Sequence, residues 1–159
     1  MQLTTAQAAT LKAAILAEAN ATLVAALAVR DDTGVADWYN ATTATVVWRS
    51  HVQLAEVGKA FVATSLSSMT SLNNDRLVSF ALYNGDGINP SRADHRAFFD
   101  DVFSPTSGAP ARTALATLWR RTATRAEALF ATGIGTTASP ATLAAEGPLS
   151  AGDVAAALN

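Results

Sequence analysis

The close spacing of helix start signals is the feature that most constrains what this chain can fold into. In a capping box, a Ser or Thr side chain and a Glu or Gln side chain three residues later each accept a bond from a backbone amide at the helix start. Three pairs follow or approach this pattern: Thr4 with Gln7, Thr124 with Glu127, and Ser150 with Asp153. Polar or glycine-rich stretches interrupt the apolar periodicity soon after each start. The sequence therefore predicts short helices rather than long ones.

Further signals place the remaining elements. Caps are expected at Asn20, at Asp32 or Thr33, at Asn73 or Asn74, and at Asn89 before Pro90, and two more helices are expected from Gln53 to Phe61 and from Ala111 onward. Thr45 to Trp48 is rich in β-branched residues and is expected to be extended. A loop is expected from Arg30 to Gly34, a loop or a loose turn of helix from Thr64 to Ser71, and a linker from Ser104 to Pro110. The predicted fold class is mainly α, an irregular bundle of short helices with long loops and at most one or two very short strands.

Length and composition predict one helical domain over residues 1–159. Half of the residues are apolar and 15% are charged, which is typical of chains that fold. Much of the apolar half is alanine, so the core is expected to be thin. The segment 133–152 is dense in Gly, Thr, Ser and Pro, and we expect it to form an irregular arm used in contacts between subunits.

Charge and residue usage exclude several function classes. The net charge is −2, so no overall field attracts nucleic acid or an anionic membrane. The chain has no cysteine, which removes disulfides, thiolate nucleophiles and cysteine metal sites. The first residues lack a basic segment followed by an unbroken apolar run. We expect a product of the cytoplasm with no membrane partner and no specific nucleic-acid binding.

The two histidines, His51 and His95, lack the spacing of metal ligands, so no metal site is expected. His95 and Asp100 could form an acid–base pair. However, Arg92, Arg96 and Asp100 recur every four residues, which favours ordinary charge pairing on a solvated helix face. No Gly-x-Ser-x-Gly elbow is present. We expect no enzyme activity, and a small hydrolase or nucleotide-binding protein is the remote alternative.

The segment from Gly133 to Ala138 matches the dinucleotide-binding pattern, with alanine in its last place. That pattern works only where a strand enters and a helix leaves, because the helix N-terminus receives the pyrophosphate. Here a helix is expected to enter, and Ser139 and Pro140 follow. We interpret the glycines as the end of that helix and expect no cofactor.

Four arginines around Trp119 form the one local charge feature. Guanidinium groups bind phosphates or carboxylates through two parallel hydrogen bonds. Because no lysine reinforces the cluster, a protein interface is favoured over a nucleic-acid groove. The candidate interface consists of Arg112, Trp119, Arg120, Arg121 and Arg125. A core position is the first interpretation for all three tryptophans, Trp38, Trp48 and Trp119.

Several segments together resemble a known group of proteins. These segments are Leu3 to Gln7, Leu11 to Ile15, Val47 to Ser50, Asn89 to Asp94, Leu118 to Arg121, Thr124 to Glu127, Phe130 to Gly133, Thr142 with Leu143, and Glu146 with Gly147. The chain resembles a family of small proteins encoded among the virion genes of tailed bacteriophages. The similarity covers nearly the full chain, but it consists of caps and packing residues rather than catalytic groups.

The resemblance implies a structural virion protein. In first place it implies a head-to-tail connector, or adaptor, whose copies form a ring at the neck beneath the portal, with the portal and other neck or tail proteins as partners. A tail-fibre-associated or tail-assembly protein is the alternative. The family assigns no catalytic residues. A ring subunit tolerates a thin core, because its neighbours bury further surface.

Overall fold

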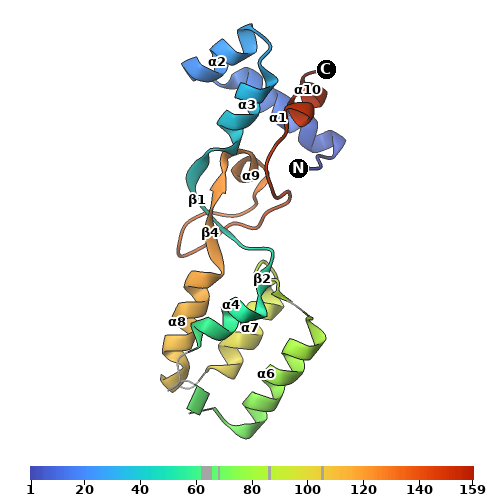
Figure 1. The fold of residues 1–159 in the computed structure, drawn as a ribbon. Coiled ribbons are helices and arrows are strands. Elements are labelled where there is room, and N and C mark those ends of the chain that lie inside the picture. The colour runs from blue at the N-terminus through green and yellow to red at the C-terminus, as the bar shows by residue number, and fades with distance from the viewer. Residues whose placement is uncertain (62–65, 68, 86, 105) are drawn as a thin grey trace. The chain divides into compact units, whose positions relative to one another are not determined.

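The fold is mainly α, as predicted. The computed structural model describes residues 1–61, 66–67, 69–85, 87–104 and 106–159 (Figure 1). It is 59% helical, with 12% in short strands. The chain forms two compact units: unit 1 is Met1–Val47 with Thr122–Asn159, and unit 2 is Trp48–Arg121. Length alone predicts one domain, because it cannot show that the chain leaves one core, builds a second and returns.

Unit 1 is built mostly of helices from the two ends of the chain. Its elements are α1 (Thr5–Ala17), α2 (Ala21–Ala28), α3 (Asp32–Asn40), β1 (Thr42–Trp48), β4 (Arg120–Thr124), α9 (Arg125–Phe130) and α10 (Ala151–Leu158). Strand β1 pairs with β4, and the chain passes between the units within these two strands. Helix α10 packs against both α1 and α3.

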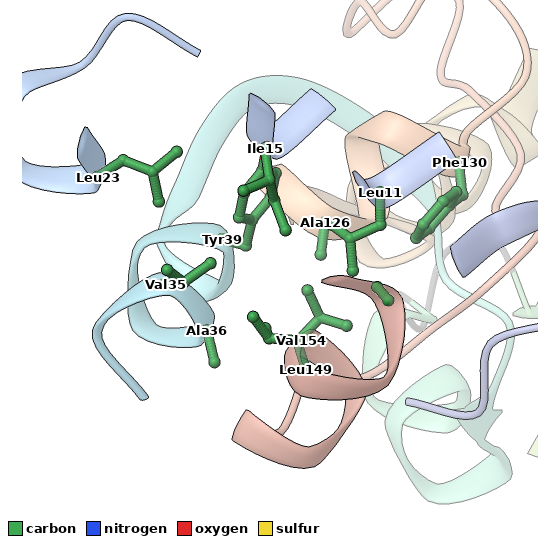
Figure 2. Close-up of a cluster of buried hydrophobic side chains, with 11 residues drawn as sticks. Leu11, Ile15, Leu23, Val35, Ala36, Tyr39, Ala126, Phe130, Leu149 and Val154 are labelled. Carbon is green, nitrogen blue, oxygen red and sulfur yellow. The ribbon is translucent and has the colours of Figure 1, made fainter. Parts of the chain in front are cut away.

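The core of unit 1 joins side chains that are far apart in the sequence. Figure 2 shows Leu11 and Ile15 of α1 converging with Val154 of α10. All three side chains are fully buried. Leu11 and Ile15 are four residues apart and therefore share one face of α1. Burial of each such side chain contributes roughly 1.5–3 kcal/mol, which holds the two ends of the chain together.

Unit 2 is one continuous segment. Its elements are β2 (Val52–Gln53), α4 (Leu54–Ala60), α6 (Ser71–Tyr83), β3 (Gly87–Ile88), α7 (Ala93–Val102), the 3-10 turn η1 (Thr106–Gly108) and α8 (Ala109–Leu118). Strand β2 pairs antiparallel with β3, placing Val52 opposite Ile88. The core is rich in aromatic rings. The ring of Phe99 lies 5.4 Å from those of Phe80 and Trp119, both in edge-on geometry.

The capping signals predict the start of four helices correctly. The capping boxes of α1, α9 and α10 have both of their bonds, from Thr4 and Gln7, Thr124 and Glu127, and Ser150 and Asp153. Asn20 caps α2 through the amide of Thr22 at 3.0 Å. These signals are reliable because both bonding groups lie within one helical turn.

Other helices begin earlier than predicted. Helix α6 begins at Ser71 rather than after Asn73 or Asn74, because the hydroxyl of Thr70 accepts a bond from the Asn73 amide at 3.2 Å. Helix α3 is capped by Asp31, one residue before Asp32 and two before Thr33, the expected caps. The expected loop from Thr64 to Ser71 lies partly outside the described residues, at positions 64, 65 and 68.

Asn89 and Pro90 do not begin a helix. The side chain of Asn89 instead accepts a bond from the Ser91 amide at 3.0 Å, which makes a turn, and α7 begins only at Ala93. Helix α8 begins at Ala109, so Pro110 lies in its first turn and not in a linker. Pro105 of that expected linker lies outside the described residues.

The segment 133–152 is irregular, as expected, but it is bonded into unit 1 and does not extend from it as an arm. The amide of Val46 in β1 donates to the carbonyl of Gly135 at 2.8 Å, and the carbonyl of Val46 accepts from Ala141 at 2.9 Å. Leu149 lies in the core with 4% exposure. These bonds hold the segment in unit 1, and its use in contacts between subunits stays a prediction.

In the part of the chain that is described, no single helix is long and apolar enough to cross a membrane. Helices α1 and α2 reach that length and apolarity only together, with a bend of 108° at the break between them.

Candidate functional site

A pocket in unit 2 gathers charged and aromatic side chains, and we call it the Arg96 pocket. Its volume is about 140 Å³, and it is lined by Trp48, Arg96, Phe99, Asp100, Arg112, Leu115, Ala116 and Trp119. The residues from α7 are three and four positions apart, and those contributed by α8 and its C-cap follow the same spacing. Each set therefore shares one helix face. Two helix faces and the ring of Trp48 thus form a pocket with cations at its wall.

The guanidinium of Arg96 is fixed in place. Its Cζ atom lies 4.3 Å from the centroid of the Trp48 ring, and Nη1 donates to the carbonyls of Pro90 at 2.5 Å and Ser91 at 3.0 Å. Burial lowers the pKa of Arg96, and the charge of Asp100 acts in the opposite direction. Within the described residues, no carboxylate lies at ion-pair distance from this guanidinium. Arg96 is therefore a partly desolvated cation held by a ring and two carbonyls.

Trp119 contributes a polar atom without a partner. Its side chain packs edge-on against Phe99, and the residue is only 4% exposed. Among the described residues, its Nε1 is the one buried side-chain nitrogen or oxygen that makes no hydrogen bond. A buried indole N–H usually finds an acceptor, and leaving such a donor unsatisfied costs about 1–3 kcal/mol.

The structure does not bring the predicted interface residues together in one unit. Arg112, Trp119, Arg120 and Arg121 lie in unit 2, whereas Arg125 lies in unit 1. Trp119 is part of the core of unit 2, which is its other predicted position. Arg120 bonds through Nε to the carbonyl of Ala116 in the preceding helix. Of the five, Arg112 and Trp119 line the Arg96 pocket.

Arg125 has structural contacts within unit 1. Its Nη1 donates to the carbonyl of Trp38 at 2.7 Å, and its Cζ lies 4.2 Å from the centroid of the Trp38 ring. Its own amide donates to the carbonyl of Ala41 at 3.0 Å. These contacts tie the start of α9 to the end of α3.

His95 packs inside unit 2. It is buried, its Nδ1 accepts a bond from the Asn89 amide at 3.3 Å, and its ring lies 5.1 Å from that of Phe80. Burial lowers the pKa of His95, and the charge of Arg92 adds to this effect. Arg92 itself pairs with Asp94 at 2.6 Å. The predicted charge pairing of Arg92, Arg96 and Asp100 along one solvated face is therefore replaced by a local pair and a half-buried Arg96.

The described part of the chain holds no group of three or more His, Asp or Glu side chains placed to bind a metal ion.

The glycines of the segment from Gly133 to Ala138 allow close packing, of Gly133 beside Ala141 and of Gly135 on β1. Helix α9 already ends at Phe130, so these glycines do not end it. Gly133 has a φ of +122° and Gly135 a φ of +75°, values that favour glycine. A Cβ atom on Gly135 would lie 2.7 Å from the Cγ2 of Thr45. The segment following Gly135 contains bends rather than a helix, so the dinucleotide arrangement is not formed.

Sequence reasoning missed an exposed apolar face on α6. Leu72, Val78, Leu82 and Tyr83 are 67%, 52%, 79% and 91% exposed. At 100° per residue they fall on one side of the helix, and we call this surface the α6 outer face. Helix α6 has no fully buried residue. The signal was present in the sequence, because apolar residues occur on both sides of the expected helix.

No protein family, curated protein or solved structure matches this chain.

Proposed function

We propose that this chain is a structural virion protein of a tailed bacteriophage. In this proposal it is a head-to-tail connector, or adaptor, subunit that assembles with copies of itself into a ring at the neck beneath the portal. The sequence resemblance supports the virion part. One structural observation supports the assembly part, namely the α6 outer face.

The inner side of α6 contacts α7. The side-chain amide of Asn73 donates to the carbonyl of Val102 at 3.0 Å, and the ring of Phe80 stacks on that of Phe98 at 4.2 Å. The helix therefore cannot turn its outer side inward without losing these contacts. Leucine and tyrosine side chains that stay in water forgo roughly 25 cal/mol per Å² of burial, and several of them on one side of a helix favour an assembly surface.

Localisation in the particle tests the proposal directly. Virions carrying an antibody or gold label on this protein should show the label at the neck in electron micrographs. Label confined to the tail periphery would contradict the connector role and favour the fibre-associated alternative. Label absent from mature particles would contradict a virion component and favour a tail-assembly protein.

A surface variant tests the assembly part on the purified chain. Leu82→Asp places a charge on the α6 outer face, and Leu16→Asp places one at a similarly exposed position of α1, where Leu16 is 66% exposed. We expect Leu82→Asp to shift the oligomer toward monomer in sedimentation velocity, whereas Leu16→Asp should not. If the wild-type chain and both variants assemble equally, the α6 outer face is not an assembly surface.

A further inference from the structure

We propose that a groove in unit 1 is a binding site for an α-amino acid, whose carboxylate contacts Arg125 and whose ammonium group contacts Glu18 and Tyr39. The groove has a volume of about 360 Å³ and is formed by residues of α1, α3, β1 and α9, and we call it the Arg125 groove. Nothing in this assignment depends on the virion role, because all of the lining residues belong to unit 1.

The groove holds one oriented positive charge. Arg125 is half-buried, and its contacts with the carbonyl and the ring of Trp38 fix the guanidinium in place. Within the described residues, no carboxylate lies at ion-pair distance from Arg125, and its Nε and Nη2 make no hydrogen bond. Arginine presents such donors in a planar fork that matches the two oxygens of a carboxylate. Arg125 is therefore oriented for a carboxylate of a ligand.

The groove also holds one oriented negative charge, on Glu18. Its Oε1 accepts bonds from the amides of Ala19 at 3.1 Å and Asn20 at 3.2 Å, which fixes the carboxylate at the end of α1. In the part of the chain that is described, Oε2 has no hydrogen bond and no cation lies at ion-pair distance. Glu18 and Arg125 thus line one groove without pairing with each other. A zwitterion satisfies both charges, whereas a simple anion or cation is repelled by one of them.

The hydroxyl of Tyr39 is the second, independent observation. Tyr39 lines the groove and is only 4% exposed, and its hydroxyl makes no hydrogen bond to a described residue. The hydroxyl is not among the unbonded polar atoms sealed from solvent, so it remains accessible. Burial raises the pKa of Tyr39 to about 12, and the charge of Glu18 adds to this effect. A neutral hydroxyl beside a carboxylate can accept a bond from an ammonium group that the carboxylate attracts.

The size and walls of the Arg125 groove restrict the ligand further. Its volume of about 360 Å³ lies near the lower end of the range of roughly 300–1,000 Å³ found for small-molecule sites. Ala128, Leu129 and Trp38 provide apolar surface beside the charged groups. The groove therefore suits a small amino acid with an apolar side chain, such as leucine.

The indole N–H resonance of Trp38 in the ¹⁵N-labelled chain provides the readout, because Trp38 lines the groove. It is assigned by its loss in Trp38→Phe. The wild-type chain is titrated at constant ionic strength with leucine, with N-acetyl-leucine, which lacks the ammonium group, and with leucinamide, which lacks the carboxylate. We expect leucine to shift the resonance with saturation. Each analogue should bind about tenfold or more weakly, because one charged hydrogen-bonding group is lost.

Variants test the role of each side chain against the matching analogue. Arg125→Gln should weaken leucine about tenfold and remove the preference for leucine over leucinamide, because the partner of the carboxylate is lost. Glu18→Gln should likewise remove the preference for leucine over N-acetyl-leucine. Tyr39→Phe should weaken leucine a few-fold. Arg30→Gln is the matched control, since Arg30 is an arginine of unit 1 outside the groove, and it should bind leucine like the wild type.

Three results would overturn the proposal. They are a Trp38 resonance that leucine leaves unchanged; an analogue that binds as tightly as leucine; and equal weakening of leucine by Arg125→Gln and Arg30→Gln. Far-ultraviolet circular dichroism of each variant shows whether the fold is retained. Glu18→Gln keeps an oxygen acceptor for the two amides, and Tyr39→Phe removes a hydroxyl that bonds no described residue. These two variants therefore keep the test valid if Arg125→Gln is unstable.

Discussion

Unit 1 and unit 2 reach stable cores by different means. All aromatic residues except Trp38, Tyr39 and Phe130 lie in unit 2, where the rings of Phe80, Phe98, Phe99 and Trp119 contact one another. Unit 1 has mainly aliphatic side chains, and its core joins the first 47 residues to the last 38. The buried core of unit 2 contains the large rings of Phe99, Phe103 and Trp119, whereas that of unit 1 consists mostly of Leu, Ile, Val and Ala.

Polar ties compensate for the smaller side chains of unit 1. The side-chain amide of Asn40 donates to the carbonyl of Leu149 at 2.9 Å and accepts from its amide at 2.8 Å. Glu127, which is 2% exposed, accepts from the amide of Gly147 at 3.1 Å. These bonds hold the irregular segment before α10 against the helices. The comparison teaches that alanine-rich helices can enclose a core when polar side chains form hydrogen bonds with the backbone of the segments that connect the helices.

The largest loss of stability is expected from a substitution in the aromatic core of unit 2. Phe99 is 1% exposed and contacts three other rings, so Phe99→Ala should lower the free energy of unfolding by about 3–5 kcal/mol. Urea unfolding followed by tryptophan fluorescence in a Trp38→Phe background reports on unit 2. Leu82→Ala, at an exposed position, is the control and should change little. A loss below about 1 kcal/mol for Phe99→Ala would contradict a ring-based core.

The next effect tests the polar ties of unit 1. Glu127→Ala removes the acceptor of the Thr124 amide at 3.0 Å and of the Gly147 amide, and should cost about 2–3 kcal/mol. Hydrogen exchange at the Gly147 amide should accelerate. Glu127→Gln keeps one oxygen acceptor and should cost less. If exchange at Gly147 is unchanged in Glu127→Ala, the tie does not hold the segment, and unit 1 depends on apolar packing alone.

A smaller effect is expected in the pH dependence of the free energy of unfolding, to which His95 in unit 2 contributes. Because the pKa of His95 is lowered in the folded chain, the unfolded chain binds more protons once the pH falls below the ordinary histidine value of about 6.5. Stability should be fully present above that pH and should fall as the pH drops toward 5, by less than about 1.4 kcal/mol per pH unit. The pKa of Asp94 is lowered to about 2, so its own contribution is lost only at far lower pH.

His95→Asn separates this contribution from others. An asparagine oxygen can accept the bond from the Asn89 amide but does not titrate between pH 5 and 7. Urea unfolding of this variant at pH 5 and pH 7 should therefore show a smaller difference than in the wild type. An equal difference in both proteins would mean that another group causes the loss.

Signals confined to one helical turn could be predicted from the sequence, and signals that depend on distant residues could not. Thr4, Thr124 and Ser150 were identified as caps because their partners are three residues away. Strand β4 was missed, because Arg120 to Thr124 has no alternation of apolar and polar residues and extends only by pairing with β1. Asn89 was misassigned because its side chain serves a turn as readily as a helix start.

The residues of the candidate site could likewise be predicted only where the signal lies within one segment of the sequence. Arg112 and Trp119 were singled out from the sequence because they lie on one segment. Arg96 was assigned to a solvated face, because nothing in the sequence shows that α7 packs its Arg96 side against Trp48. The unpaired Nε1 of Trp119 is likewise a property of tertiary packing.

The smallest expected effect concerns Arg30 in unit 1. The amide of Arg30 donates to the carbonyl of Leu27 at 3.2 Å, and that of Asp31 donates to Ala26 at 2.9 Å, which is the Schellman pattern at the end of α2. Arg30 has a φ of +54°, a conformation that glycine adopts without steric cost. Arg30→Gly should therefore raise the stability of unit 1 by about 0.5–1 kcal/mol. Arg30→Ala keeps a Cβ atom and should give no gain. Urea unfolding of both variants measures the difference, and an equal stability would show that the unit already absorbs this strain at no cost.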